Sequence, residues 1–433
     1  MDPVNVGIIG IFLLVFLFLL KMPVAFSMAF VGWLGFSYLT SFHAGLKILA
    51  RDFFEQFSNF PISAIPMFIL MGSFAFASGI GKRLYDAAYT ILGNLRGGLT
   101  MATVVACGFF AAICGSTAAT AATIGKIALP EMKRYHYDET FATGCVASAG
   151  TLGILIPPST IFLVYGIITE QSIGKLFIAG IIPGIILTFL FLIVVGLWCW
   201  RDPSCAPAGA STDLRAKGKA LVGIVEALIL FGLVIGGLFL GWFTPTQAGG
   251  IGAAGALVIG LVRRELSWRV FIESTRDGLR TSCMVLCVIT GAIVFGHFMA
   301  VSTIPFILAD WVERLPLPPM AIMGVIVFIY LIGGCFMDSM ALVVLTVPVI
   351  YPVVVRLGFD PIWFGVIIVL VAEMGVITPP VGVNVYVIKG IAPGVPLEKI
   401  FKGIFPFLVA IIINALILMA FPKLALILPG LIK

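Results

Sequence analysis

Long apolar stretches alternate with short polar ones along almost the whole chain. An α-helix needs roughly 20 apolar residues to cross a bilayer. Runs of this kind predict membrane spans at roughly 4–20, 22–40, 61–80, 141–169, 172–200, 220–240, 242–262, 281–302, 362–389 and 400–422. The pattern therefore predicts an all-α polytopic membrane protein with about ten spans.

Two further apolar stretches, 99–129 and 320–355, are interrupted near their middles. Gly115-Ser116-Thr117 interrupts the first, and the segment 333–339 interrupts the second. Each half is about 14–18 residues long, which is short for a full span. We expect two re-entrant helical hairpins that enter and leave the membrane on one side. A pair of ordinary tight spans is the alternative.

Two segments of mixed character, 44–58 and 265–280, place their apolar residues at helical spacing. Both are typical of amphipathic helices that lie along the membrane interface. The hydrophilic linker 201–219 separates a first half, 1–200, from a second half, 220–433. The first span follows Asp2 without a basic segment before it, so we expect it to be retained rather than cleaved.

The two halves repeat each other. Gly153 precedes the pair Pro157-Pro158 by four residues, and a shift of 222 positions places them on Gly375 and Pro379-Pro380. The same shift superposes further pairs, namely Pro23 on Pro245, Pro130 on Pro352, Asp138 on Asp360 and Ser116 on Asp338. An odd number of spans, five, separates Asp138 from Asp360. The repeats are therefore predicted to be inverted, as in many secondary carriers.

Basic residues predict the orientation. Of the 26 Lys and Arg residues, nineteen lie on the side opposite the N-terminus. The positive-inside rule places that side in the cytoplasm and the N-terminus in the periplasm.

The Pro-Pro pairs indicate where the chemistry lies. Two consecutive prolines cannot continue a helix, and the carbonyls they free need a protein partner or a water-filled cavity. Carbonyls and hydroxyls at matched broken helices coordinate Na⁺, and helix N-termini favour anions. We predict one cation site per repeat, from Ser116, Thr117, Gly153, Ile156 and Pro157 in the first and Gly334, Met337, Asp338, Gly375 and Thr378 in the second. Candidate substrate-binding residues are Ser116, Thr117, Pro158, Ser159, Ser339, Pro380 and Asn384.

Two acids lie deep in apolar sequence, Asp338 and Glu373. Acids inside a membrane are costly and usually functional. Asp338, at a predicted hairpin tip, favours a Na⁺ site. Glu373 has either a direct cation role or a structural one between hairpin and helix.

Composition agrees with a membrane protein. The chain is 61% hydrophobic and 11% charged, with a mean hydropathy of +1.17, whereas soluble domains carry about 25% charged residues. The net charge of +6 therefore does not predict a nucleic-acid partner. The three His residues do not pair with Cys or Glu at metal-site spacing, which argues against a metalloenzyme.

Several long phrases resemble the large membrane subunit of TRAP (tripartite ATP-independent periplasmic) transporters, which belong to the ion transporter superfamily. They are residues 115–125, 154–159, 243–248, 360–365 and 373–384. One departure is Gln247, where the family commonly has Glu. The resemblance covers nearly the whole chain.

The resemblance implies a function. It implies symport driven by the Na⁺ gradient, with Na⁺ as the sole bound ion and an organic acid such as a C4-dicarboxylate, sialic acid or another sugar or keto acid as the substrate. A periplasmic binding protein would deliver the substrate, and a small four-helix membrane subunit would be a separate chain. The location would be the inner membrane of a bacterium or archaeon.

The resemblance also implies an elevator fold. Its transport domain would be roughly 61–180 plus 281–395, and the other spans would form the scaffold. The family motif places cation ligands at Ser116, Gly153, Pro157, Gly334, Asp338, Gly375 and Thr378.

Three alternatives remain. A stand-alone carboxylate carrier of the same superfamily is the closest. An intramembrane hydrolase with Asp338 and Asp360 as a dyad is disfavoured, because the topology places Asp360 at the surface. A channel is disfavoured because two closed hairpin tips suit occlusion better than a continuous pore.

Overall fold

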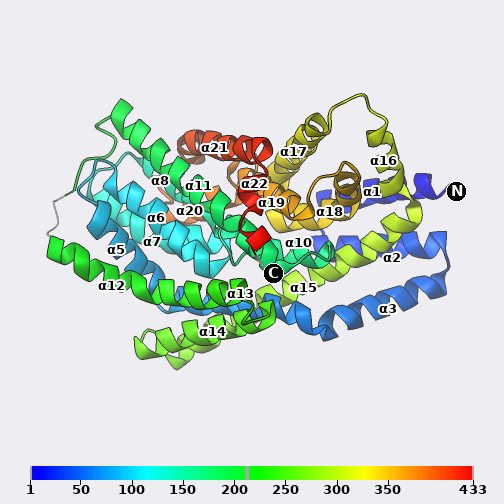
Figure 1. Cartoon of the computed structure of the whole chain (residues 1–433), viewed down its shortest axis with the longest axis horizontal. Coiled ribbons are helices and arrows are strands. Elements are labelled where there is room, and N and C mark those ends of the chain that lie inside the picture. The colour runs from blue at the N-terminus through cyan, green and yellow to red at the C-terminus, as the bar shows by residue number, and fades with distance from the viewer. Residues whose placement is uncertain (1, 210–213, 432–433) are drawn as a thin grey trace.

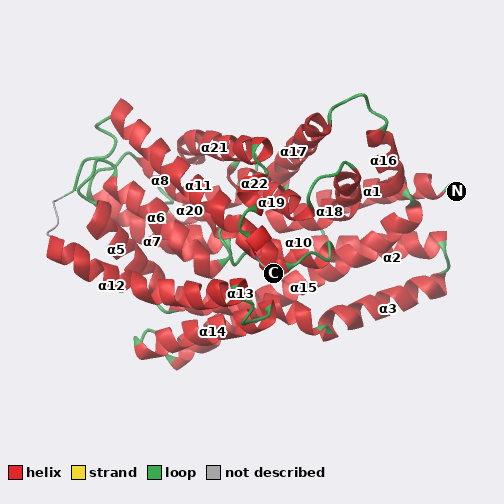
Figure 2. Ribbon diagram, in the orientation of Figure 1, coloured by secondary structure: helices red, strands yellow, loops and turns green. Residues whose placement is uncertain are grey.

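The computed structural model describes residues 2–209 and 214–431. Within those residues all regular structure is helical (Figure 2). Nine helical segments of this part of the chain are long and apolar enough to cross a membrane, and shorter apolar helices accompany them. The predicted all-α polytopic fold is thus confirmed.

The first half of the chain extends from α1 to α11. Its helices are α1 (Pro3–Leu19), α2 (Val24–Leu39), α3 (Phe42–Ser58), the 3-10 turn η1 (Phe60–Ser63), α4 (Ala64–Ala77), α5 (Ile80–Leu92), α6 (Gly98–Cys114), α7 (Thr117–Arg134), α8 (Glu139–Ala149), α9 (Leu152–Leu155), α10 (Thr160–Ile168) and α11 (Ile173–Arg201). Part of the predicted linker 201–219 falls outside the described residues, at 210–213.

The second half extends from α12 to the C-terminal end. Its helices are α12 (Leu214–Phe231), the π-helical turn η2 (Gly232–Gly236), α13 (Gly237–Phe239), α14 (Pro245–Val262), α15 (Trp268–Ser302), α16 (Ile304–Glu313), α17 (Pro319–Phe336), α18 (Ser339–Arg356), α19 (Pro361–Ile377), α20 (Val383–Ile391), α21 (Leu397–Ala420), α22 (Lys423–Leu426) and the 3-10 turn η3 (Pro429–Leu431).

The helices of the two halves correspond under the shift of 222 positions. The predicted hairpins are present as α6–α7 and α17–α18, on opposite sides of the centre of the molecule (Figure 1). Packing is reciprocal as well. Helix α2 packs on the second half of α15, where a Cβ on Gly291 would meet the Ala25 carbonyl. In the other repeat α14 corresponds to α2 and α4 corresponds to this half of α15, and α14 packs on α4 in the same way. Helices α5 and α16, which the hydropathy pattern did not predict, also correspond.

One interface helix differs from its prediction. The segment 265–280 is not separate from the span 281–302, because both belong to the single 35-residue helix α15. Its equivalent α3 ends at Ser58, and the chain then turns through Phe60 and Pro61 before α4 begins. The position equivalent to Pro61 is Cys283, which leaves the helix of the second half uninterrupted.

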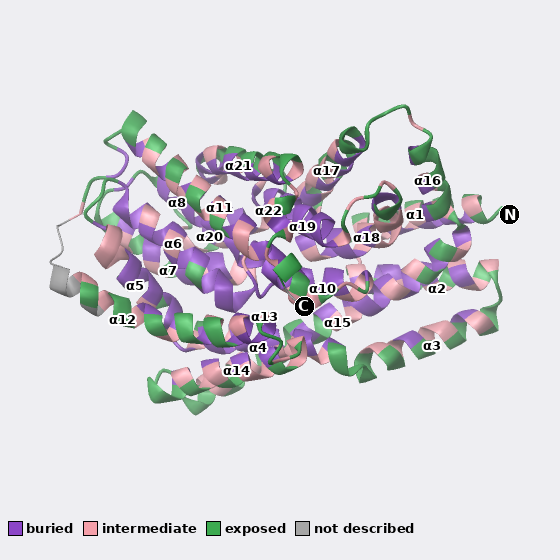
Figure 3. Cartoon of the chain, in the orientation of Figure 1, coloured by how far each residue is buried: buried purple, intermediate pink, exposed green. Residues whose placement is uncertain are grey.

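Both crossing helices with Pro-Pro pairs are broken as predicted. In the first half α8, α9 and α10 replace one continuous helix, and in the second half α19 ends at Ile377 and α20 begins at Val383. The peptide bonds Pro157-Pro158 and Pro379-Pro380 are both cis. Helix α19 lies at the centre of the molecule, and every residue of it from Ile362 to Ile377 is buried (Figure 3).

Gln247 serves a local structural purpose. It lies at the third position of α14, where its side-chain oxygen accepts a hydrogen bond from the Thr244 N–H at 2.9 Å. The Thr244 hydroxyl accepts in turn from the Gln247 N–H at 3.3 Å. Such a capping box forms with either Gln or Glu at this position. Gln247 therefore still caps the N-terminus of α14, although the family commonly has Glu there.

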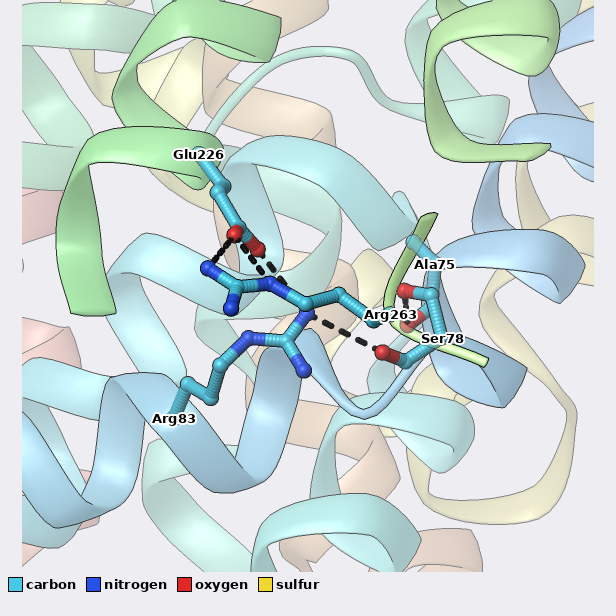
Figure 4. Close-up of polar contacts among 5 residues, drawn as sticks. All are labelled: Ala75, Ser78, Arg83, Glu226 and Arg263. Carbon is cyan, nitrogen blue, oxygen red and sulfur yellow. Dashed lines mark hydrogen bonds and ion pairs between the residues drawn. The ribbon is translucent and has the colours of Figure 1, made fainter. Parts of the chain in front are cut away.

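An ion-pair network joins three helices of this fold (Figure 4). Glu226 of α12 pairs with Arg263 after α14, and its other oxygen lies 3.0 Å from Arg83 Nη2 of α5. Arg83 also donates to the Ser78 carbonyl at 3.0 Å. The Glu226 and Arg83 side chains are only 19% and 21% exposed, and that of Arg263 is 46% exposed, so this carboxylate neutralises one partly buried cation and one more exposed cation.

Replacing Glu226 with Gln should therefore destabilise the protein by about 1–3 kcal/mol, because two guanidinium groups lose a charged partner. Thermal unfolding of the purified protein in detergent measures this effect. Arg269→Gln is the control, because its pair with Glu273 is highly exposed and worth little. Equal melting temperatures for the two variants would contradict a stabilising network.

Candidate functional site

The tip of the first hairpin lies against the break in the first crossing helix. Gly115 adopts a left-handed conformation at φ 66°, and Ser116 then begins α7. A Cβ placed on Gly153 would collide with the Ser116 carbonyl, so the two backbones are in contact. The Thr160 hydroxyl donates to the Gly115 carbonyl at 3.1 Å and fixes the tip to the start of α10.

The tip of the second hairpin meets α19 in the same way. A Cβ on Gly375 would collide with the Gly334 backbone, and the Val381 N–H donates to the Cys335 carbonyl at 3.3 Å. Met337 ends α17 and Asp338 begins α18, where the Asp338 carboxylate accepts from the Met340 N–H at 3.1 Å. Thr378 follows the end of α19, and its hydroxyl donates to the Met374 carbonyl.

Both hairpin tips line one cavity of about 570 Å³. Ser116 and Thr117 come from the first tip, and Asp338 and Ser339 from the second. The opposite wall belongs to α4 and the first half of α15. Tertiary structure thus joins residues that are 222 positions apart in the sequence. The lining residues include three acids, Asp338, Glu273 and Asp277, and neither Lys nor Arg among those described.

The predicted substrate-binding residues divide into two groups. Ser116, Thr117 and Ser339 line the cavity, and the Ser339 hydroxyl donates to the Ala372 carbonyl at 3.2 Å.

The remaining four, Pro158, Ser159, Pro380 and Asn384, are not among its lining residues. The Ser159 hydroxyl accepts from the Phe162 N–H at 3.3 Å and caps α10, and the Asn384 amide donates to the Ala147 carbonyl at 3.1 Å. A direct contact between substrate and these four residues stays a prediction.

The predicted cation ligands lie where hairpin and broken helix meet. Gly153, Pro157, Gly334 and Gly375 are buried, and the Ile156 side chain points away, into an apolar groove between α6, α11 and α12. In this geometry Ile156 could offer its backbone carbonyl to a cation but not its side chain. Carbonyls and hydroxyls of this kind are the oxygen donors that a hard cation such as Na⁺ accepts.

Two buried hydroxyls near the first break were not predicted. Thr120 Oγ1 and Ser148 Oγ are buried without a hydrogen-bond partner in the described part of the chain. Thr120 Oγ1 lies 2.8 Å from where a Cβ on Gly153 would be, beside the Ser116 carbonyl. A signal was present in the sequence, because Thr120 follows Ser116 by four residues and shares its helix face.

Glu373 is fully buried in α19, and neither carboxyl oxygen has a hydrogen-bond partner among the described residues. An unpaired ionised carboxylate would cost several kcal/mol at such a position. The carboxyl group is therefore either protonated or paired with a cation. Its two predicted roles, in a cation site or as a structural link between hairpin and helix, both stay predictions.

Together, the paired hairpins, the broken helices and the shared cavity define a class of membrane transport protein with two-fold internal repeats. The comparisons with known proteins agree. The family model of the tripartite ATP-independent periplasmic transporter, DctM component, matches residues 11–424. The chain belongs to this family of large permease subunits.

Relatives of the chain are similar over almost their full lengths. The C4-dicarboxylate TRAP transporter large permease protein DctM of Pseudomonas aeruginosa is 36% identical over 89% of this chain and 90% of its own. The sialic acid TRAP transporter large permease protein SiaM of Vibrio cholerae is 32% identical over 95% of each chain. The 2,3-diketo-L-gulonate TRAP transporter large permease protein YiaN of Escherichia coli is 30% identical over 94% of this chain and 95% of its own.

The fold is also similar to that of a solved transporter. The Alcanivorax borkumensis YdaH transporter aligns with a TM-score of 0.62 over 88% of this chain and 89% of that chain. Sequence identity in this alignment is 14%, so the likeness concerns the fold alone.

Proposed function

We propose that this chain is the large permease of a TRAP system that imports an organic carboxylate with the energy of the Na⁺ gradient. The observation that carries the proposal is the meeting of both hairpin tips in one cavity, each tip against a broken helix. Family membership supports it, since the three relatives above are named for carboxylates. Their names differ in the substrate, so the particular carboxylate is not part of the proposal.

We further propose that two Na⁺ ions bind where the hairpins meet the breaks. The first site would use oxygens near Ser116, Thr120 and Gly153, and the second would use Asp338 with oxygens near Gly375 and Thr378. Each ion would hold a tip against its helix and shape the cavity. By linkage, Na⁺ and the anion then raise each other's affinity.

Transport would follow an elevator mechanism in which the hairpins and broken helices move as one body. The predicted moving part is 61–180 plus 281–395. At its borders, α4 packs mainly on α14 and α15, and α21 packs on α8, α11 and α19. The part of α15 that is equivalent to α4, residues 286–299, belongs to a helix that packs mainly on α2 and α4. We therefore propose that α4 and this part of α15 move less, and that α21 moves more, than the sequence division suggests.

The test is uptake into proteoliposomes that contain this chain and a small membrane subunit, with a periplasmic binding protein outside. We would supply succinate, sialic acid and 2,3-diketo-L-gulonate in turn. One of them should accumulate only under an inward Na⁺ gradient, and accumulation should stop when the gradient is collapsed. Uptake by this chain without its partners would instead favour the stand-alone carrier.

Thr120→Val should raise the Na⁺ concentration for half-maximal uptake several-fold, because the variant removes a buried oxygen at nearly constant volume. The measurement is the Na⁺ dependence of uptake in the same system. Thr90→Val, on α5 and outside both proposed cation sites, is the control. An unchanged Na⁺ dependence in Thr120→Val would remove this hydroxyl from the first site.

A further inference from the structure

The cavity is open on one side of the molecule and closed on the other. On the open side, α4 and the first half of α15 form a wall that faces the tip of the first hairpin. The repeat assigns an equivalent wall to the opposite side, made of α3 and the second half of α15. There α15 packs directly on α18 of the second hairpin.

On the closed side, Gly296 of α15 lies opposite Pro348 of α18. A Cβ on Gly296 would lie 3.9 Å from the Pro348 Cβ. On the open side the residue equivalent to Pro348 is Lys126, which reaches α4 through its long side chain and places its ammonium 6.0 Å from the centre of the Phe76 ring. Helix α18 packs on α15, whereas α7 approaches α4 through the Lys126 side chain, so the two sides differ in how closely hairpin and wall are packed.

The two walls also differ in charge. Glu273, Ser274 and Asp277 of α15 line the open cavity. Their equivalents on α3 are Arg51, Asp52 and Glu55. A guanidinium thus replaces a carboxylate at the first of these positions. The Arg51 side chain is 69% exposed and lies 2.8 Å from Glu55.

The wall on the closed side is held together by its own contact. Asp52 is almost fully buried, and its Oδ2 lies 3.2 Å from His297 Nε2 of α15. This pair fixes α3 against α15 one residue away from Arg51. The wall is thus a formed surface, although α18 now packs against its α15 half.

We propose that α18 separates from α15 at Gly296 and Pro348 during transport, and that Arg51 then receives the anionic substrate on the newly opened side. The inference rests on the proposed function, because it requires a cavity that opens alternately to both sides. A guanidinium on the side of entry favours an anion by charge and by paired hydrogen bonds. On the other wall Glu273 is paired with Arg269, and the Asp277 carboxylate disfavours the anion there and so favours its departure.

The first test is a reversible lock. In the full complex, with the eight native cysteines replaced, Gly296→Cys and Pro348→Cys are combined, since 3.9 Å between Cβ atoms suits a disulfide. Oxidation should abolish uptake of whichever of the three carboxylates is transported, and reduction should restore it. Each single-cysteine variant should transport under both conditions. Uptake that persists after complete cross-linking overturns the inference but leaves the proposed function intact, whereas a native chain without Na⁺-driven uptake overturns both.

The second test concerns Arg51. Arg51→Gln should raise the concentration of loaded binding protein needed for half-maximal uptake by about tenfold, the loss of one charged contact, with little change in the maximal rate. Lys47→Gln is the matched control, because Lys47 is an exposed cation on the same helix whose equivalent, Arg269, is not among the cavity-lining residues. Equal effects of the two substitutions would show a general surface charge rather than an anion site and would overturn the role of Arg51.

Discussion

Asp338→Asn is expected to reduce Na⁺-driven uptake at least tenfold. The variant removes the negative charge at the tip of the second hairpin, where a cation would otherwise gain its strongest partner. Asn is also a good N-cap residue, so α18 should still begin correctly. Uptake rates over a range of Na⁺ gradients, in proteoliposomes with both partner subunits, measure the effect.

The control for Asp338→Asn is Asp277→Asn, which removes a carboxylate from the opposite wall of the same cavity. It should leave the Na⁺ concentration for half-maximal uptake unchanged, because Asp277 lies on α15 and outside both proposed cation sites. If Asp338→Asn retained the Na⁺ dependence of the parent protein, the second cation site would not use this carboxylate.

Gly375→Ala should have a comparably large effect for a steric reason. The added Cβ would collide with the Gly334 backbone, which has no rotamer through which to move away. Overpacking of this kind costs about 1–3 kcal/mol, and here it would push the hairpin tip off α19. We expect uptake to fall at least tenfold and the stabilisation of the purified protein by Na⁺ in thermal unfolding to disappear.

The matched control is Gly324→Ala, in α17 of the same hairpin, where an added Cβ would meet open space. Alanine favours a helix over glycine by about 1 kcal/mol, so this variant should be at least as stable as the parent and should transport normally. Normal uptake by Gly375→Ala would mean that the contact between Gly334 and Gly375 is not required for the site.

Much of the fold could be predicted from local pattern. Apolar runs of membrane length located the spans, and small polar residues at 115–117 and 333–339 located the turns of both hairpins. The prediction failed for α15, which was expected to be two separate helices. The amphipathic segment and the span each show their own hydrophobic pattern, and neither pattern indicates whether the helix is continuous from one to the other. Helices α5 and α16 were missed because they are short and only moderately apolar.

The site divides in the same way. The residue types alone indicated that Ser116, Asp338 and the helix breaks at Gly153 and Gly375 belong to the site, since small residues and prolines interrupt helices. The repeat linked these positions across the chain. Thr120 and Ser148 were missed because a Thr or Ser in a helix is ordinary until its hydroxyl is known to be buried without a partner.

The sequence by itself determined that this is a two-fold repeated membrane protein with paired hairpins and broken helices, because hydropathy, proline and a fixed shift of 222 positions are all properties of the linear chain. Only the tertiary structure decided that both tips line one cavity and that Gly334 packs on Gly375. It also decided that the cavity is open on the side of α4 and closed on the other side, where α18 packs on α15. Those features depend on which surfaces meet in space. The two repeats have the same order of elements and nevertheless pack differently, which a linear pattern cannot specify.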